Sequence, residues 1–286
     1  MTYHLGESLL KKTLNMLKLM HKIERNKYGV QLKSIGRFFL GISLIFIFGQ
    51  THAQHYLPVG CKHPEFPKIR DHETVTLHSG YSLVYNEKHE QASWVAYILT
   101  KKETQGTIER GDRFIEDPNI STGSATNADY SKSGYDRGHL APAADMKWSE
   151  KVMAESFFFS NMSPQVPSFN RGIWKKLEEK VRDWAICYDS VLVITGPILE
   201  NGLPTIGKNE VSIPKYYFKA LIDYKHEKSK AIAFIIPNSG SKDPLKKFIC
   251  SIDELELRTG IDFFYQFEDH LENTLEKQKC PTCWGL

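Results

Sequence analysis

Hydrophobic positions recur at strand spacing in several short segments of the chain. Apolar and polar residues alternate in 81–85 (YSLVY), and 94–100 (WVAYILT) is rich in β-branched and aromatic residues, so both predict strands. Apolar runs of strand length also occupy 157–159, 191–196, 216–223 and 231–237. These segments together predict a sheet that is largely buried.

Other segments carry helical signals. From Asn170 onward, apolar residues recur with a period of 3.6 and define one face, formed by Ile173, Trp174, Leu177, Val181, Trp184 and Ala185. Ser149 can cap a short helix that runs through Glu155, and Ser251–Glu254 is a capping box for a helix that Gly260 ends. With no internal repeat and no composition break, strands and helices together predict one α+β domain.

A polar stretch from Lys101 to Gly134 separates the second predicted strand from the region that follows. Turn signals occur at Asp117-Pro118 and at 122–124 (TGS). A loop of this length inside a compact domain is usually functional. It carries Arg110 and Arg113 toward the next motif.

The N-terminal 53 residues have the order of a secretory signal. Residues 38–49 (FFLGISLIFIFG) form an apolar run too short to span a bilayer, Lys33 and Arg37 precede it, and a small residue, Ala53, follows. We expect cleavage after Ala53, secreted or periplasmic localisation, and no stable membrane association afterwards. An uncleaved anchor is the alternative, and a start assigned too early, with Met20 as the true start, would explain the long charged lead.

Net charge gives no support for nucleic-acid binding once this segment is set aside. The chain of 286 residues has 37 basic and 34 acidic residues, but residues 1–53 hold eight of the basic and two of the acidic ones. The domain expected at 54–286 therefore has 29 basic and 32 acidic residues, a net charge of −3. Attraction to phosphate must therefore be local.

Five cysteines leave at least one thiol free or paired with another molecule. Cys280 and Cys283 form a CPTC motif in the C-terminal tail. A zinc or redox site is one interpretation, but no second CxxC accompanies it, so a structural disulfide is favoured. The pairing of Cys61, Cys187 and Cys250 cannot be read from the sequence.

Three neighbouring motifs carry the chemistry. They are 135–142 (YDRGHLAP), 160–165 (SNMSPQ) and 170–174 (NRGIW). A neutral histidine near pH 7 is suited to taking a proton from water. An asparagine carbonyl is a hard oxygen ligand for a largely hydrated Mg²⁺. The combination predicts metal-assisted hydrolysis of a phosphodiester.

In this order, the motifs resemble those of the DNA/RNA non-specific endonuclease family, which includes secreted bacterial sugar-non-specific nucleases and mitochondrial endonuclease G. The resemblance extends to flanking segments and covers roughly residues 60–270. It implies an α+β fold, a ββα-metal nuclease core with a central, mainly antiparallel sheet flanked by helices. The histidine would lie on a strand of a hairpin-like pair and the metal ligand on a crossing helix.

The resemblance also implies roles for five residues. His139 would be the general base, and Asn161 would help to hold the histidine. Arg113 would stabilise charge on the phosphorane. Asn170 would be the direct protein ligand of Mg²⁺, for which Mn²⁺ can substitute, and Glu178 would act through water. The alternatives are a buried structural histidine, a turn at Asn161 and an exposed ion pair at the arginine.

Four further residues complete the candidate site. Arg110 and Arg171 are candidates for substrate binding, and Arg110 is close enough to Arg113 that the two could exchange roles. Arg137 is a candidate catalytic residue. Asp136 is expected to act indirectly, by supporting the residues around it. Either of these last two could instead only shape the turn.

The sequence therefore predicts a secreted or periplasmic, Mg²⁺-dependent endonuclease that cuts DNA and RNA, with the family implying 5′-phosphorylated products. Its contacts would go to phosphate and metal rather than base edges, so sequence would not be read. A nuclease-like nucleic-acid-binding module and a zinc-dependent hydrolase built on Cys280, Cys283 and nearby histidines are the alternatives. Relatives are often dimers, so a homodimer is one option, and the preference between DNA and RNA stays open.

Overall fold

The computed structural model describes residues 61–224 and 229–286, all within the compact unit Gln54–Leu286. The predictions for the signal segment, its cleavage after Ala53 and the start at Met20 lie outside the described residues. None of the helices in the described ranges combines the length and the apolar character that a membrane crossing needs.

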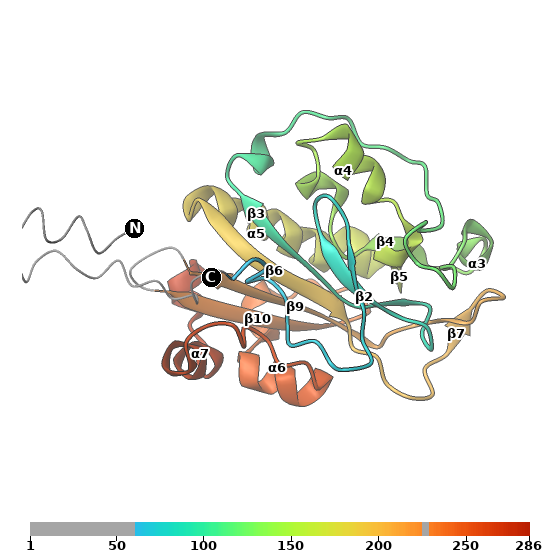
Figure 1. Ribbon diagram of the computed structural model, residues 1–286. Coiled ribbons are helices and arrows are strands. Elements are labelled where there is room, and N and C mark those ends of the chain that lie inside the picture. The colour runs from blue at the N-terminus through green and yellow to red at the C-terminus, as the bar shows by residue number, and fades with distance from the viewer. Residues whose placement is uncertain (1–60, 225–228) are drawn as a thin grey trace, which may run out of the picture. The chain divides into compact units, whose positions relative to one another are not determined.

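A seven-stranded antiparallel sheet forms the centre of the domain (Figure 1). Its order is β1-β2-β3-β6-β9-β10-β11. The strands are β1 Val75–Leu77, β2 Ser82–Asn86, β3 Gln91–Thr100, β6 Ser190–Pro197, β9 Tyr216–Asp223, β10 Lys230–Pro237 and β11 Ile249–Cys250. The sheet therefore contains the strands expected at 81–85, 94–100, 191–196, 216–223 and 231–237.

Helices cover both faces of this sheet, which is why the central strands are apolar along their whole length. In β9, Tyr217 and Leu221 pack toward α5, whereas Phe218 and Ala220 belong to a second apolar cluster that includes residues of α6 and α7. Figure 1 shows α5 and α6/α7 on opposite sides. The helices are α3 Asn127–Tyr130, α4 Glu150–Glu155, α5 Lys175–Cys187, α6 Ile252–Thr259 and α7 Asp269–Glu276.

The helix ends follow the predicted signals. Ser251 accepts a hydrogen bond from the Glu254 backbone nitrogen, and the Glu254 carboxylate accepts one from the Ser251 backbone in return. Gly260 ends α6 in the left-handed conformation, with φ of 66°. Ser149 occupies the N-cap position of α4, as expected, but its side chain makes no capping hydrogen bond.

A separate two-stranded antiparallel ribbon holds the histidine motif. It consists of β4 (Asp136–His139) and β5 (Met162–Gln165), in a register that places His139 opposite Met162. Gly138 is required here because a Cβ would lie 2.2 Å from the Gln165 side chain. A second ribbon pairs β7 (Thr205–Ile206) with β8 (Val211–Ser212).

The strand predicted at 157–159 is wrong. Backbone turns tie Phe157 and Phe158 to the end of α4, since their nitrogens bond to the carbonyls of Ala154 and Glu155. Phe158 makes only an isolated bridge to Ile115, and Phe159–Asn161 is a 3₁₀-helix. The apolar run is buried because its rings fill the space beneath the cleft, and a short apolar run cannot by itself distinguish these states.

The polar stretch 101–134 is held to the domain by a buried carboxylate rather than by regular structure. Asp117 accepts a hydrogen bond of 2.5 Å from the Ser160 hydroxyl, and its carboxylate lies 2.9 Å from Nε2 of His78. Burial alone would raise the pKa of Asp117, but these partners outweigh it and lower the pKa. The stretch contains only a 3₁₀ turn at Glu103–Gln105 and the short α3.

The C-terminal tail is closed by the predicted disulfide between Cys280 and Cys283. It follows α7 and positions Trp284, whose ring packs edge-on against Trp184 of α5 at 4.9 Å between centroids. The other three cysteines, Cys61, Cys187 and Cys250, form no disulfide.

Candidate active site

One cleft of about 550 Å³ brings together residues from two of the three motifs, 135–142 and 170–174. His139 from β4, Asn170 from the segment after β5 and Glu178 from α5 line it together. The rest of the lining is formed by Arg110, Phe114, Asp136, Arg137, Pro142, Ala143, Ala144, Arg171, Lys175 and Arg182. The imidazole and the amide expected to act on one phosphate therefore face the same space.

Aromatic contacts hold the His139 ring at the cleft. The ring packs edge-on against Phe157 at 4.9 Å and Phe114 at 5.9 Å between centroids. Only 8% of the residue is exposed, and Nε2 has no hydrogen-bond partner in the described part of the chain. Burial, then the charges of Arg110 and Arg137, lower the pKa of His139 to about 3. The imidazole is therefore neutral and can accept a proton.

Asn161 supports the histidine through the backbone that follows it. Its Oδ1 accepts a 2.8 Å hydrogen bond from the Ala141 nitrogen, while Nδ2 donates to the carbonyls of Ala141 and Ser156, each at 2.9 Å. Asn161 is fully buried and is not part of the cleft wall. It fixes the turn after His139, and the structure gives no hydrogen bond from it to the imidazole.

Asp136 orients Asn170. Its Oδ2 accepts a 2.9 Å hydrogen bond from Asn170 Nδ2, and its two oxygens also accept from Arg171 at 2.9 and 2.6 Å. Burial raises the pKa of Asp136, but the hydrogen bonds from Arg171 and Asn170 outweigh it and keep that pKa below its ordinary value. Asp136 is thus an ionised acceptor, and Arg171 is engaged with it.

The helix expected from Asn170 begins as a π-helix, Phe169–Trp174, before α5 starts at Lys175. Gly172 has φ of −109° and ψ of −108°, outside the helical region, and breaks the register between Asn170 and Glu178. The angle that an unbroken α-helix would place between these two side chains therefore does not apply. Single π-turns are frequent at functional sites. Both side chains still reach the cleft.

Glu178 is a half-buried carboxylate that accepts no hydrogen bond from any described residue. Burial raises its pKa, and the nearby cations Lys219, Arg182 and Arg110 oppose the rise. A further positive charge in the cleft would stabilise the ionised form of the Glu178 carboxylate.

The arginines are placed differently from one another. Arg110 lies over the Phe157 ring at 5.4 Å and Arg137 over the Phe114 ring at 4.2 Å, and both line the cleft. Arg137 also donates to Asn127 Oδ1 at 2.6 Å. Arg113, the residue expected to face the phosphorane, is exposed and is absent from the cleft lining.

The sequence did not point to Arg182, or to Asp145 and Tyr97, which are buried behind it. Arg182 lines the cleft and donates to Asp145 Oδ1 at 2.7 Å, and Asp145 also accepts from the Tyr97 hydroxyl at 2.8 Å. Arg182 follows Glu178 by four residues, which places them on one helix face, so this spacing could have indicated it. Nothing local in the sequence marks Asp145.

The cleft fits a hard divalent cation. The Asn170 nitrogen is held by Asp136, which leaves its oxygen available, and the Glu178 carboxylate lacks a hydrogen-bond donor among the described residues. Amide and carboxylate oxygens are the ligands that Mg²⁺ takes, usually together with several waters. Asn170 would hold the ion directly and Glu178 through water.

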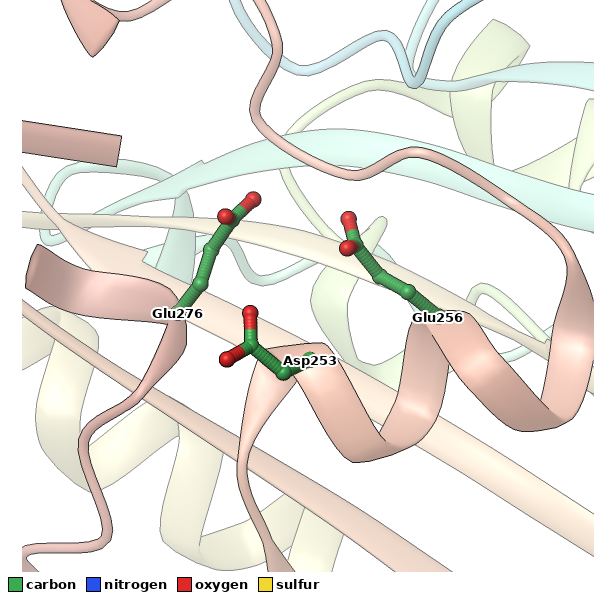
Figure 2. Close-up of side chains that lie close together, drawn as sticks. All are labelled: Asp253, Glu256 and Glu276. Carbon is green, nitrogen blue, oxygen red and sulfur yellow. The ribbon is translucent and has the colours of Figure 1, made fainter. Parts of the chain in front are cut away.

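A separate group of carboxylates lies outside the cleft. Figure 2 shows Asp253 and Glu256 of α6 and Glu276 of α7 pointing toward one another, with ligand oxygens within 4.8 Å. Burial and then the neighbouring acids raise the pKa of Glu276 to about 8. These helices cover the sheet face opposite α5, so the group does not contribute to the cleft.

Comparison with known proteins agrees with this geometry. The sequence profile of the family described as DNA/RNA non-specific endonuclease matches residues 66–270, which is more than half of the chain. The chain belongs to the DNA/RNA non-specific endonuclease family. His139 and Asn170, to which the family resemblance assigns the base and the metal ligand, line the same cleft.

Individual relatives agree with the family assignment. The chain is 35% identical over 205 residues to the protein named nuclease EXOG, mitochondrial, of Danio rerio, which covers 66% of this chain and 60% of the relative. It is 35% identical over 201 residues to human endonuclease G, mitochondrial, covering 64% of this chain and 67% of that protein. Nuclease C1 of Cunninghamella echinulata var. echinulata is 35% identical over 204 residues, 64% of this chain and 80% of the relative.

A solved structure matches the fold as well. The crystal structure of the EndoG/EndoGI complex contains a chain that is 32% identical, with a TM-score of 0.66. The match covers 71% of this chain and 89% of that chain. The expected α+β fold with a large antiparallel sheet is therefore confirmed.

Proposed function

We propose that this protein is a Mg²⁺-dependent endonuclease that hydrolyses phosphodiester bonds of DNA and RNA without sequence specificity, with Mn²⁺ able to replace Mg²⁺. The observation that carries the proposal is the shared cleft of His139 and Asn170. A binding module would not need an unpartnered, neutral imidazole beside an available amide oxygen. The zinc alternative loses its ligands because Cys280 and Cys283 are bonded to each other.

His139 acts as the general base. Its ring is held by Phe114 and Phe157 and is neutral, so the imidazole can take the proton of a water entering the cleft. That water attacks phosphorus as the bond to the 3′ oxygen breaks, leaving a 5′-phosphate. The negative phosphate offsets the repulsion from Arg110 and Arg137, so the imidazole becomes a stronger base when substrate is bound.

Arg110 and Arg137 neutralise charge on the phosphate, and Arg110 takes the role that the family resemblance alone assigned to Arg113. Both guanidinium groups lie over aromatic rings, which holds them at the cleft wall. Asp136 holds Asn170 in place, with Arg171 as a further anchor. When bound, Mg²⁺ supplies Lewis-acid stabilisation of the phosphate and the leaving oxygen.

The substrate contacts explain the breadth of the proposed activity. Every side chain assigned a role addresses water, phosphate or metal, and none is assigned to a base edge. The test is digestion of supercoiled plasmid and of RNA by the full chain, with the products examined for 5′-phosphate by ligation. Cleavage of both polymers supports the proposal, and failure to cleave either in the presence of Mg²⁺ contradicts it.

We also propose that the protein is exported, with residues 1–53 as the signal. The support is the sequence order of basic residues, an apolar run of twelve and a small residue at Ala53. N-terminal sequencing of protein recovered from outside the cytoplasm should begin at Gln54. A protein retained in the membrane fraction with its N-terminal segment intact would contradict cleavage.

A further inference from the structure

A lysine lies fully buried behind the cleft, in the middle of the inner strand β9. Lys219 has no solvent-exposed surface. It alternates with Phe218 and Ala220, which pack on the far side of the sheet, and shares its face with Tyr217 and Leu221. Lysine is among the residues least often fully buried, and then usually with a partner.

The ammonium is not satisfied by hydrogen bonds. Nζ has no hydrogen-bond partner in the described part of the chain, and it lies 4.7 Å from the centroid of the Trp174 ring. Trp174 is the last residue of the π-helix that carries Asn170, and α5, which carries Glu178, starts at the next residue. The buried charge therefore contacts the residue that joins the two oxygen donors.

Lys219 lies near three other charged side chains, Glu178, Asp145 and Arg182. Arg182 is committed to Asp145, at 2.7 Å, and Asp145 is further held by the Tyr97 hydroxyl. Glu178 has no hydrogen-bond partner among the described residues. It follows Trp174 by four residues, which places both side chains on one helix face, and Lys219 Nζ lies over the Trp174 ring, so the ammonium attracts the Glu178 carboxylate. Glu178 is the strongest attractive charge acting on Lys219, opposing the fall in pKa that burial causes. The two ions therefore attract each other without a hydrogen bond between them.

We propose that Lys219 is a positioning residue of the metal site, whose buried ammonium holds the Glu178 carboxylate beside Asn170. The inference rests on the function proposed above and names a residue behind the cleft that it requires. Without a fixed positive charge on the protein side, the carboxylate would be drawn to the cleft arginines or to bulk water. Lys219 can attract the Glu178 carboxylate from the protein interior, because it does not line the cleft and would not contact substrate.

A purely structural role makes a different prediction. If Lys219 only packed against Trp174, an apolar side chain of similar length would replace it with no effect on the metal. The substitution Lys219→Met keeps the length and removes the charge. It separates the two roles when metal binding is measured directly rather than through cleavage.

The experiment is calorimetric titration of the nucleic-acid-free full chain with Mn²⁺. We expect Lys219→Met to weaken binding by about tenfold or more, as removal of a residue that supports a ligand does. Glu178→Gln should weaken binding similarly, and the double variant should bind no worse than Glu178→Gln alone, because both changes remove one interaction. Lys219→Arg should recover part of the affinity because it keeps the charge.

Lys215 provides the matched control. It lies four residues earlier, is exposed and lies 3.6 Å from Glu200. Lys215→Met should leave Mn²⁺ affinity within about twofold of wild type, as surface substitutions usually do.

Normal Mn²⁺ affinity in Lys219→Met, or additive losses in the double variant, would overturn the inference. If Lys219→Met does not fold, the double variant decides: recovery of folding by Glu178→Gln supports the pairing, and continued failure assigns Lys219 to structure alone. Wild-type cleavage together with normal metal binding by Lys219→Met refutes only this inference. Absence of wild-type cleavage refutes the proposed function itself.

Discussion

Asn170 donates a hydrogen bond of 2.9 Å from Nδ2 to Oδ2 of Asp136, 34 residues earlier. The bond joins the strand that carries His139 to the π-helix that carries Asn170, the proposed metal ligand. It fixes which end of the amide is available, since a nitrogen held by a carboxylate leaves the oxygen for a cation. One contact between two motifs thus fixes the proposed metal ligand relative to the proposed base.

Asp136→Ala removes this anchor. We expect Mn²⁺ affinity to fall by about 10–100-fold, the usual loss when a partner of a metal ligand is removed. Asp136 is half-buried at the cleft edge, so the fold should persist. Calorimetry measures the affinity, and Asp243→Asn, an exposed carboxylate paired with Lys247, is the control. Unchanged affinity in Asp136→Ala would show that Asn170 is oriented by other means.

Substitution by alanine should lower the cleavage rate much more at Arg110 than at Arg113. Arg110 lines the cleft and acts on His139, whereas Arg113 is exposed outside the lining. We expect Arg110→Ala to lower kcat by about 10²–10³-fold, as loss of a charge-stabilising donor does. Arg113→Ala should change the rate only a few-fold. Initial rates on a short duplex measure both, and the reverse ranking would return the catalytic role to Arg113.

The buried imidazole should make the fold sensitive to acid. His139 titrates at about 3 when folded, below its ordinary value of 6.5, so between these values the unfolded chain binds a proton that the folded chain does not. The contribution of His139 to the free energy of unfolding is fully present above pH 6.5. It is lost as the pH falls, by at most about 1.4 kcal/mol per pH unit. Urea unfolding from pH 7 to 4 should show a steeper loss for wild type than for His139→Gln. Parallel curves would mean that the histidine is not held neutral.

Removing the C-terminal disulfide tests the zinc alternative. Replacing Cys280 and Cys283 by serine opens a four-residue loop, for which the chain-entropy relation gives a loss of about 2 kcal/mol. Cleavage measured well below the melting temperature should stay within about twofold of wild type, because neither residue lines the cleft. The zinc alternative would be favoured if the serine variant did not cleave and if chelated wild type regained cleavage only when zinc was added.

Motifs and periodicity predicted the sheet, the helix boundaries and the two motifs, 135–142 and 170–174, that meet in the cleft, because each depends on local pattern. The run 157–159 was misassigned, since three buried aromatic residues satisfy a strand or a turn equally well and the choice depends on backbone bonds to α4. The start of the metal-ligand helix was predicted, but its π-turn at Gly172 was not. Glycine permits that conformation without requiring it.

The contacts that define the site join segments that are far apart in sequence. Local sequence patterns do not predict such contacts. The bond between Asp136 and Asn170, and the placement of Arg110 rather than Arg113 at the cleft wall, depend on how the loop 101–134 folds back. Lys219 could have been noticed as a lysine within an apolar strand, YYFKALID. Its neighbour Glu178 could not have been inferred from that pattern.

The rate of plasmid cleavage by His139→Ala, beside wild type, tests the shared role of imidazole and metal most directly. With Mg²⁺ present, wild type should cleave, stop after chelation and resume when Mg²⁺ or Mn²⁺ is restored. His139→Ala, folded and melting near the wild-type temperature, should cleave about 10²–10⁴-fold more slowly. His72→Ala, an exposed histidine outside the cleft, should match wild type. A folded His139→Ala protein that cleaves at the wild-type rate, or wild-type cleavage that survives chelation, would contradict the mechanism.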